Sequence, residues 1–496
     1  MSTDSTARPN VLVIMSDDQG AWAMRCAGNT DLHTPNLDRL AETGIRFESC
    51  FCASPVCSPA RASFLTGRMP SQHGVHDWLR KGNVEDPEGQ HGHDRPVEYL
   101  AGMLGYTEVL AQKGYRCALS GKWHMGASQT PQKGFGHWFT HGFGGGPYYG
   151  WIAVRDGNLY KEPGYVTDVF TDEALRFLDT HGDDPEPWYL HVTYTAPHSP
   201  WDRDNHPAEV WETYNDCDFT ATPDLPLHPW QANTAPQGTG ERRKELLHGY
   251  YTAITAMDTQ IGRILDWLEA HGQRENTLVV FTSDNGMNMG HHGIWGKGNG
   301  TFPMNLFDTS CKVPLIFSRP GQIAQGRVEE RMVCHYDFMP TLLDYLGYEN
   351  PDAEQLPGSS YAPLLVGGVC PEREAIVMYD EYGPVRMIRT REHKYIHRYP
   401  YGPNEFYDLR EDPEECHNLV SDPARKGLMN ELKLQMEQWF NRYVIPEFDG
   451  IRQPVNGRGQ LDRVDVVPWE GRTFDTDIKL SDDRHSFYFD EEWPSV

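Results

Sequence analysis

The sequence predicts an α/β protein with a large, mixed and mostly parallel sheet sandwiched by helices, followed by a smaller C-terminal α+β domain. Two continuous apolar runs, residues 11–16 and 277–283, are typical of strands that are buried on both faces at the centre of such a sheet. Helical and strand patterns alternate between these runs, as expected where helices cover a parallel sheet. Beyond a change of composition near residues 367–375, short alternating strands precede a single long helix.

The individual elements follow from local patterns along the chain. Residues 34–43 have a helix pattern with Pro next to the start and Gly44 after the end. Residues 241–271 repeat apolar side chains at helical spacing, which predicts a long amphipathic helix. The other expected elements are helices at 107–113, 171–180 and 337–346, and strands at 115–119, 188–194 and 313–318. Residues 199–240 are rich in Pro, Trp, His and Asp and predict a long loop that forms a wall of the active site.

The chain divides into three expected segments, with boundaries after residues 370 and 448. Residues 1–370 form the large α/β domain, and residues 371–448 form the α+β domain, with strands at 376–379, 385–389 and 395–397 and a helix at 423–443. Residues 449–496 are an irregular, acidic and aromatic tail. Such a tail is consistent with a segment that covers the body of the protein or a neighbouring subunit, so an oligomer is one alternative.

Charge and cysteine usage exclude several classes of function. With 44 Lys and Arg against 71 Asp and Glu, the formal net charge is −27, which disfavours binding to nucleic acids or to anionic membranes. No run approaches the roughly 18 apolar residues that span a bilayer. The polar N-terminus lacks the features of a secretory signal, so we expect a cytoplasmic protein. Ten scattered cysteines are expected to be buried thiols.

Oxygen-bearing side chains follow both central strands. Asp17 and Asp18 come after the first run, and Asp284 and Asn285 come after the second. One such pair is most often a turn or a helix cap. Two pairs at the carboxyl ends of central strands instead predict a ligand crevice, and their oxygen donors favour Ca²⁺, with Mg²⁺ as the alternative.

Basic side chains follow three of the predicted strands and can converge on the same crevice. Lys122 and His124 lie in the segment Gly121–Gly126, His198 follows Ala196 and Pro197, and Lys297 lies in a glycine-rich stretch. A single histidine of this kind is more often packed than catalytic. An anionic substrate would nevertheless need such a local basic cluster in so acidic a chain.

The run Cys57-Ser58-Pro59-Ala60-Arg61, followed by Leu65-Thr66-Gly67-Arg68, resembles the signature of type I, formylglycine-dependent sulfatases. The similarity extends to residues 31–38, 337–342 and 407–419 and so spans most of residues 10–420. It implies an alkaline phosphatase-like fold and hydrolysis of a sulfuric ester.

The resemblance also implies residue roles. Asp17, Asp18, Asp284 and Asn285 match the metal ligands, and Cys57, once a maturation enzyme has oxidised it to formylglycine, is the fifth ligand. The hydrated aldehyde is a gem-diol, one hydroxyl of which attacks sulfur. The remaining roles are proton donation to the leaving alcohol by His198 with Lys297, uptake of a diol proton by His124, neutralisation of sulfate by Lys122 and Lys297, and orientation of the diol by Arg61.

The sequence departs from the family pattern after Lys297, where an acidic residue and an arginine are common in other members. Asp308 and Lys312 are candidates to replace them. His292 matches a family His-Gly pair without an assigned role.

The resemblance implies a small sulfated substrate, with a sulfated sugar or another small sulfate ester as the expectation. Five side chains are candidates to contact a sugar ring, with packing as the alternative role: Tyr148, Tyr149, Trp151, Trp201 and Arg203. A phosphonate monoester or phosphodiester hydrolase of the same superfamily is the alternative function. A non-catalytic binding protein is disfavoured because each motif residue is present.

Overall fold

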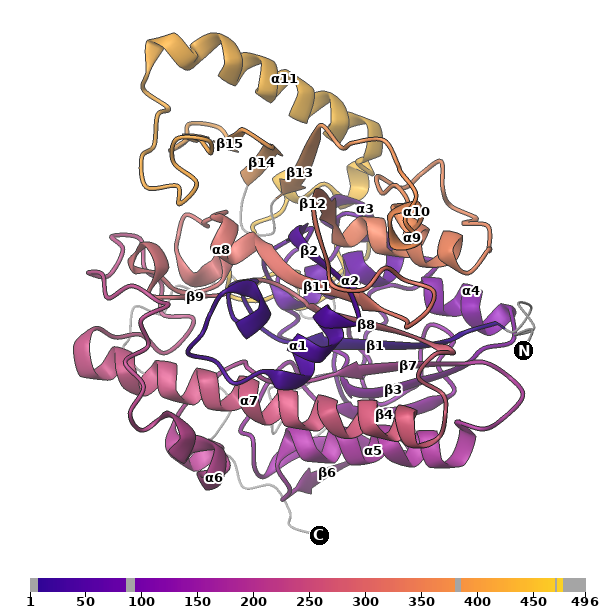
Figure 1. Ribbon diagram of the computed structural model, residues 1–496. Coiled ribbons are helices and arrows are strands. Elements are labelled where there is room, and N and C mark those ends of the chain that lie inside the picture. The colour runs from indigo at the N-terminus through magenta and orange to yellow at the C-terminus, as the bar shows by residue number, and fades with distance from the viewer. Residues whose placement is uncertain (1–7, 86–93, 380–384, 469–470, 476–496) are drawn as a thin grey trace.

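The computed structural model describes residues 8–85, 94–379, 385–468 and 471–475. A ten-stranded sheet runs through the body with helices on both faces, and a four-stranded sheet with one long helix lies beside it (Figure 1). The predicted fold class is therefore confirmed. Among the described residues, no helix is both long and apolar enough to cross a bilayer.

The centre of the large sheet is parallel. Strand β1 (Asn10–Ser16) lies between β7 (Trp188–Thr193) and β8 (Thr277–Ser283) and runs parallel to both. Strand β3 (Arg116–Lys122) continues the parallel order beyond β7. The two flanks are completed by β11 (Lys312–Ser318), β2 (Gly44–Phe51) and β12 (Arg327–Cys334) beyond β8, and by β4 (His137–His141), β5 (Trp151–Arg155) and β6 (Asn158–Glu162) beyond β3.

Several flanking strands were not expected from the sequence. Strand β12 contains Arg327, Glu329, Glu330 and Arg331, and β6 is only partly buried at the edge of the sheet. Because these strands bury few apolar side chains, they leave no continuous apolar run for sequence reasoning to find.

Alternate side chains of β1 serve two cores, one on each face of the sheet. Leu12 and Ile14 pack with helices α1 (Pro35–Glu42), α5 (Val166–His181) and α7 (Gly240–Ala270). Val11, Val13 and Met15 pack on the other face with α2 (Cys57–Thr66), α4 (Tyr106–Gln112) and α9 (Phe338–Tyr345). The remaining short elements are α3 (Pro70–His73), α6 (Ala208–Trp211), α8 (Asp308–Cys311), α10 (Ala362–Leu365), β9 (Asn288–Met289) and β10 (Trp295–Gly296).

The strand directions bring the carboxyl ends of the strands that carry the site to one edge of the sheet. The order β8-β1-β7-β3 is parallel throughout, so the residues that follow these strands are neighbours. Strand β11 is antiparallel to both β8 and β2, so β2 also points to this edge. A short loop then leads from β2 into α2, whose first residue is Cys57.

Strand β3 is longer than expected and extends to Lys122 itself. At Gly121 the φ angle is +130°, and an added methyl group would lie 2.0 Å from the carbonyl oxygen of Thr193. The glycine thus allows β3 and β7 to approach closely just where Lys122 enters the site.

The C-terminal sheet is antiparallel and consists of β13 (Ala375–Tyr379), β14 (Val385–Thr390), β15 (His393–Arg398) and β16 (Glu405–Asp408). Helix α11 (Lys426–Tyr443) packs on it through Leu432, Met436 and Phe440. Strand β16 was not expected from the sequence.

A buried ion cluster joins this sheet to the body. The Nζ atom of Lys394 on β15 lies 2.6 Å from Asp308 and donates to the carbonyl oxygen of Leu306 at 2.9 Å. Lys394 also pairs with Glu415, and Arg389 lies 3.0 Å from Asp308. Lys312 pairs with the same Asp308 carboxylate at 3.0 Å. Asp308 therefore joins the C-terminal sheet to the body, with Lys312 paired beside it, and their role as replacements for the family's acidic residue and arginine stays a prediction.

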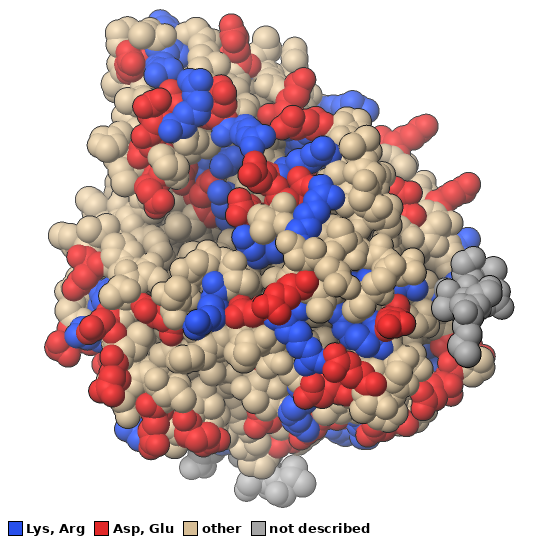
Figure 2. All heavy atoms as spheres, viewed as in Figure 1, with Lys and Arg blue, Asp and Glu red and all other residues tan. Residues whose placement is uncertain are grey.

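The described part of the C-terminal tail lies on the body. Gln460 donates from its backbone to Trp78 O at 2.9 Å and from its side chain to Gly74 O at 2.9 Å. The backbone N–H of Gly459 donates to Asp77 at 3.0 Å. Residues 469–470 and 476–496, which also belong to the expected tail, lie outside the described residues. On the face shown in Figure 2, acidic and basic side chains are interspersed rather than gathered into one patch.

We predict that Lys394→Met destabilises the protein strongly. The substitution leaves Asp308 and Glu415 buried without their main cation, so the free energy of unfolding should fall by about 3–5 kcal/mol. Lys433→Met is the matched control, because its i,i+4 pair with Glu437 is partly exposed and should be worth no more than about 0.5 kcal/mol. Denaturant unfolding measures both variants, and equal losses would contradict the assignment.

Candidate active site

Three buried carboxylates meet where β1 and β8 end. One oxygen each from Asp17, Asp18 and Asp284 lies within 4.8 Å of the others. The backbone N–H of Asp18 donates to Asp284 at 3.1 Å, with Asp18 in the left-handed region at φ 63°. Like charges this close repel unless cations stand among them.

Asn285 completes the oxygen set. Its Nδ2 atom donates to Asp18 Oδ1 at 2.9 Å, which leaves its Oδ1 atom buried with no hydrogen-bond partner among the described residues. An orphaned buried amide oxygen beside three carboxylates fits a ligand position for a hard divalent cation.

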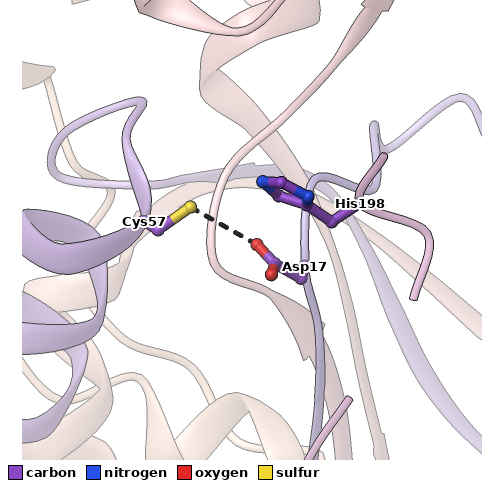
Figure 3. Close-up of side chains that lie close together, drawn as sticks. All are labelled: Asp17, Cys57 and His198. Atoms are coloured by element: carbon purple, nitrogen blue, oxygen red, sulfur yellow. Dashed lines mark hydrogen bonds between the residues drawn. The ribbon is translucent and has the colours of Figure 1, made fainter. Parts of the chain in front are cut away.

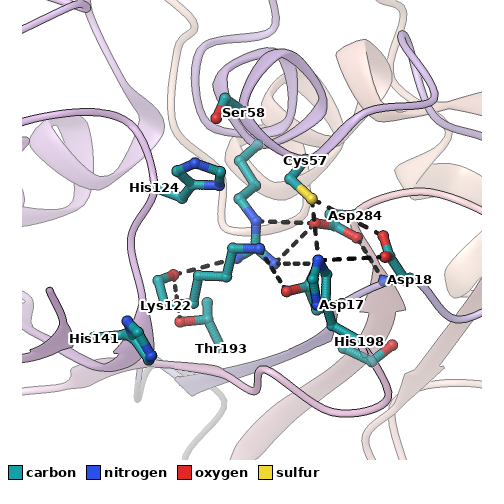
Figure 4. A network of polar contacts seen from close by, with 12 residues as sticks. Asp17, Asp18, Cys57, Ser58, Lys122, His124, His141, Thr193, His198 and Asp284 are labelled. Atoms are coloured by element: carbon teal, nitrogen blue, oxygen red, sulfur yellow. Dashed lines mark hydrogen bonds and ion pairs between the residues drawn. The ribbon is translucent and has the colours of Figure 1, made fainter. Parts of the chain in front are cut away.

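Three basic side chains contact the carboxylates, and Figure 4 labels one of them, Lys122. Arg61 from α2 reaches Asp284 through Nε at 3.0 Å and through a terminal nitrogen at 2.9 Å. Lys122 Nζ lies 2.5 Å from Asp17, and Lys297 Nζ lies 2.5 Å from Asp18. Three positive groups therefore balance three negative ones before any cation or substrate enters.

The carboxyl pKa values reflect this crowding. Burial and the neighbouring Asp284 raise the pKa of Asp17, although Lys122 opposes them. Burial also acts to raise the pKa of Asp284, but Arg61, Lys122 and Lys297 outweigh it and hold that pKa below its usual range. A divalent cation would stabilise the ionised form of all three carboxylates.

Cys57 is the first residue of α2 and points at this cluster (Figure 3). Its Sγ atom lies 3.4 Å from Asp17 Oδ1 and 2.7 Å from Lys297 Nζ, and the residue is 3% exposed. Burial, followed by Asp17, raises the pKa of the thiol in spite of the two lysines. The side chain is therefore a protonated thiol at neutral pH and a poor nucleophile as it stands.

His124 follows β3 and is fully buried. Its Nε2 atom lies 3.2 Å from the carbonyl oxygen of Leu79, which can only accept, so the Nε2 nitrogen carries the hydrogen. Its Nδ1 atom is buried with no hydrogen-bond partner in the described part of the chain. Burial, followed by Lys122 and Arg61, lowers the pKa of His124 well below its usual value. The ring is thus neutral, with one free acceptor nitrogen.

His198 follows β7 and occupies the open side of the site. Its Nδ1 atom donates to Ser199 O at 2.7 Å, and its Nε2 atom lies 3.7 Å from Asp18 Oδ2. The side chain is 25% exposed, whereas those of Lys122 and Asp17 are fully buried. The site is therefore open to solvent on the His198 side.

The structure brings the sequence-predicted site residues to one edge of the sheet, through contacts that connect Asp17, Asp18, Cys57, Arg61, Lys122, His198, Asp284, Asn285 and Lys297. His124 joins them through the electrostatic influence of Lys122 and Arg61. Their individual catalytic roles stay predictions.

Other sequence candidates lie elsewhere. Tyr148, Trp151 and Trp201 are at most 1% exposed and belong to the cores, so the expectation that they contact a sugar is wrong; Tyr149 and Arg203 are exposed. His292 stacks on Phe307 with ring centroids 3.8 Å apart.

Sequence reasoning missed His141 and Thr193. The Nδ1 atom of His141 accepts from the backbone N–H of Phe143 at 3.0 Å, and the ring stacks on Trp151. Burial, followed by Lys122, lowers the pKa of His141 to about 3. Thr193 donates to the Lys122 carbonyl oxygen at 2.8 Å. Neither residue stands in a motif, and only their positions at the ends of β4 and β7 could have drawn attention to them.

Comparisons with known proteins identify a family for most of the chain. A family model described as Sulfatase matches residues 9–348, and one described as N-sulphoglucosamine sulphohydrolase, C-terminal, matches residues 290–442. An N-acetylglucosamine-6-O-sulfatase of Bacteroides thetaiotaomicron is 29% identical and covers 89% of this chain and 88% of its own length. A choline-sulfatase of Rhizobium meliloti is 29% identical over 84% of each chain. A solved structure of a protein in complex with its substrate D-glucosamine-2-N,6-O-disulfate has a TM-score of 0.74, with 25% identity over 88% of this chain and 98% of that one.

We predict that calcium or magnesium ions raise the melting temperature of the protein purified with a chelator. A ligand at 100 times its Kd stabilises the native state by about 2.7 kcal/mol, provided that it does not bind the unfolded chain. Asp18→Asn removes one carboxylate of the cluster and should reduce the shift. Differential scanning calorimetry over a range of cation concentrations measures it. An equal shift in Asp18→Asn and wild type would contradict a cation site at this cluster.

Proposed function

The chain belongs to the sulfatase family and is a hydrolase of sulfate esters, and on that premise we propose that it acts on a sulfated carbohydrate or another small sulfate ester, with formylglycine made from Cys57 as the nucleophile. The observation that carries this proposal is the setting of Cys57, which lies at the focus of three carboxylates and two lysines as a thiol with a raised pKa. Conversion of that thiol to an aldehyde would give the site a nucleophile that it otherwise lacks.

Two groups complete the site. Asp17, Asp18, Asp284 and Asn285, with position 57, would hold a divalent cation, and Ca²⁺ is the first candidate because all the donors are oxygen atoms. The cation supplies positive charge to the sulfate oxygens and to the nucleophile, and a hydrated formylglycine supplies the attacking hydroxyl.

The lysines have a second role once a cation is bound. Lys122 and Lys297 pair with Asp17 and Asp18 in the structure. With the cation on those carboxylates, both ammonium groups can turn to the sulfate oxygens and stabilise the charge that develops there. Arg61 keeps its two contacts with Asp284 and so holds the metal ligand in place.

The two histidines divide the proton transfers. His198 lies on the open side, where the alcohol part of the ester must sit, and donates a proton to the leaving oxygen together with Lys297. His124 is neutral with a free Nδ1 atom, so it accepts the proton that must be removed when sulfate is released.

A sulfated sugar is the favoured substrate class. It is supported by the name of the N-acetylglucosamine-6-O-sulfatase relative and by the glucosamine disulfate in the similar solved structure. We also propose that a separate maturation enzyme converts Cys57, because a buried thiol with a raised pKa does not oxidise to an aldehyde unaided.

We predict that Cys57→Ala abolishes turnover, because a methyl side chain cannot become the aldehyde. Active wild type should yield a peptide over residues 46–68 from which the sulfur of Cys57 has been lost, as measured by mass spectrometry. Release of sulfate is assayed on N-acetylglucosamine 6-sulfate, N-acetylgalactosamine 6-sulfate and an aryl sulfate. Full activity of a protein in which the Cys57 thiol is intact would contradict the proposed nucleophile. Cleavage of phosphonate monoesters or phosphodiesters but of no sulfate ester would favour the alternative hydrolase.

We predict that His198→Ala lowers turnover most for sulfate esters with poor leaving groups. A sugar alkoxide needs a proton to depart, so turnover of a sugar sulfate should fall by about 100-fold or more. A nitrophenolate leaves without a proton, so the loss on nitrophenyl sulfate should be much smaller. Steady-state kinetics on the two substrates test this, with His181→Ala, a partly exposed histidine at the end of α5, as the control. Equal losses of turnover on both substrates would show that His198 is not the general acid.

A further inference from the structure

Three consecutive glycines lie against three different histidines of the site. They follow β4 in the loop at residues 142–150. A methyl group added at Gly144 would lie 2.1 Å from Nε2 of His124. One added at Gly145 would lie 3.3 Å from Cε1 of His198, and one added at Gly146 would lie 3.1 Å from Nε2 of His141. Figure 4 shows these three imidazoles arranged around Lys122.

Backbone conformation does not explain the glycines. None of the three has a φ angle in the left-handed region, so a positive φ is not what requires glycine there. Alanine would also restrict the unfolded chain and so favour folding. Space is what these positions require, and Gly144 requires it most, because the nearest atoms belong to a buried ring rather than to a flexible chain end.

Gly144 meets the edge of His124 that already carries a hydrogen bond. Nε2 donates to Leu79 O at 3.2 Å, and the same nitrogen is the nearest atom to the missing methyl group of Gly144. The Leu79 carbonyl oxygen and the Gly144 backbone thus hold one edge of the ring. The opposite nitrogen, Nδ1, is left without a partner among the described residues. Any side chain at position 144 must push the ring away from Leu79 or rotate it.

We propose that Gly144 is a positioning residue for His124: its missing side chain fixes the imidazole with Nε2 on Leu79 and Nδ1 free to accept a proton from the reacting group. This inference rests on the proposed function, because it gives His124 the proton-accepting role. Gly145 continues the same segment past His198, so one stretch of backbone borders both proton-transferring rings.

The test is Gly144→Ala, with Gly136→Ala as the matched control. Gly136 precedes β4 and has no left-handed φ. A methyl group added at this position would have no neighbouring atom nearer than 4.0 Å. Gly144→Ala should lower kcat on the best sulfate ester by about 10- to 100-fold with little change in KM. The alcohol should still appear rapidly in the first turnover, because the His124 step follows its departure. Gly136→Ala should remain within about twofold of wild type, and a Gly144→Ala kcat equally close to wild type would overturn the proposal.

A double variant separates positioning from general damage. In His124→Ala the ring is gone, so the methyl group of Gly144→Ala has room, and the double variant should match His124→Ala in both kcat and melting temperature. This comparison holds even if Gly144→Ala alone does not fold. The proposal would be overturned if Gly144→Ala lowered the kcat of His124→Ala by the same factor as it lowers that of wild type. It would also be overturned if the double variant failed to fold while His124→Ala folds. If wild type releases sulfate from no ester, the proposed function fails, and the melting temperatures alone still decide whether Gly144 acts through His124.

Discussion

The structure depends on a buried balance of three carboxylates against three cations. Asp17, Asp18 and Asp284 could not be buried together without Arg61, Lys122 and Lys297, and none of these cations could be buried alone. Asp17 and Asp18 are adjacent, but the other members come from four further positions between residues 61 and 297, so the cluster is complete only when these segments have come together. Neutral as it stands, the cluster would carry two positive charges with a divalent cation bound, and the single negative charge of a sulfate ester would balance one of them.

The topology of the sheet brings together site residues that are far apart in the sequence. Five adjacent parallel strands, β8, β1, β7, β3 and β4, end at one edge, and the register of the sheet sets which residue follows each strand. Close approach between β3 and β7 at Gly121 places Lys122 beside the carboxylates. The C-terminal sheet is tied to the body through Asp308, which follows the Lys297 loop along the chain.

The central strands and the charged residues of the site could be predicted because both leave local signals. Residues 11–16 and 277–283 are apolar runs followed by acidic pairs, and the structure has them as neighbouring strands. Strands β12 and β6 could not be found, because the charged and partly exposed side chains of edge strands look like those of loops. Aromatic residues were misjudged at Trp151 and Trp201, since the sequence cannot tell a stacking platform from a core side chain. The three glycines at 144–146 were overlooked because their significance lies in what they touch, which only the folded chain defines.

Helix α2 has a consequence for biogenesis. All ten of its residues are buried, and Cys57 is the first of them. An enzyme that recognises the sequence around Cys57 and alters its side chain must bind several neighbouring residues in an accessible form. The folded protein offers none of them. On the proposed maturation of Cys57, the alteration would have to precede the burial of this helix, and chains that fold first would keep the unmodified thiol.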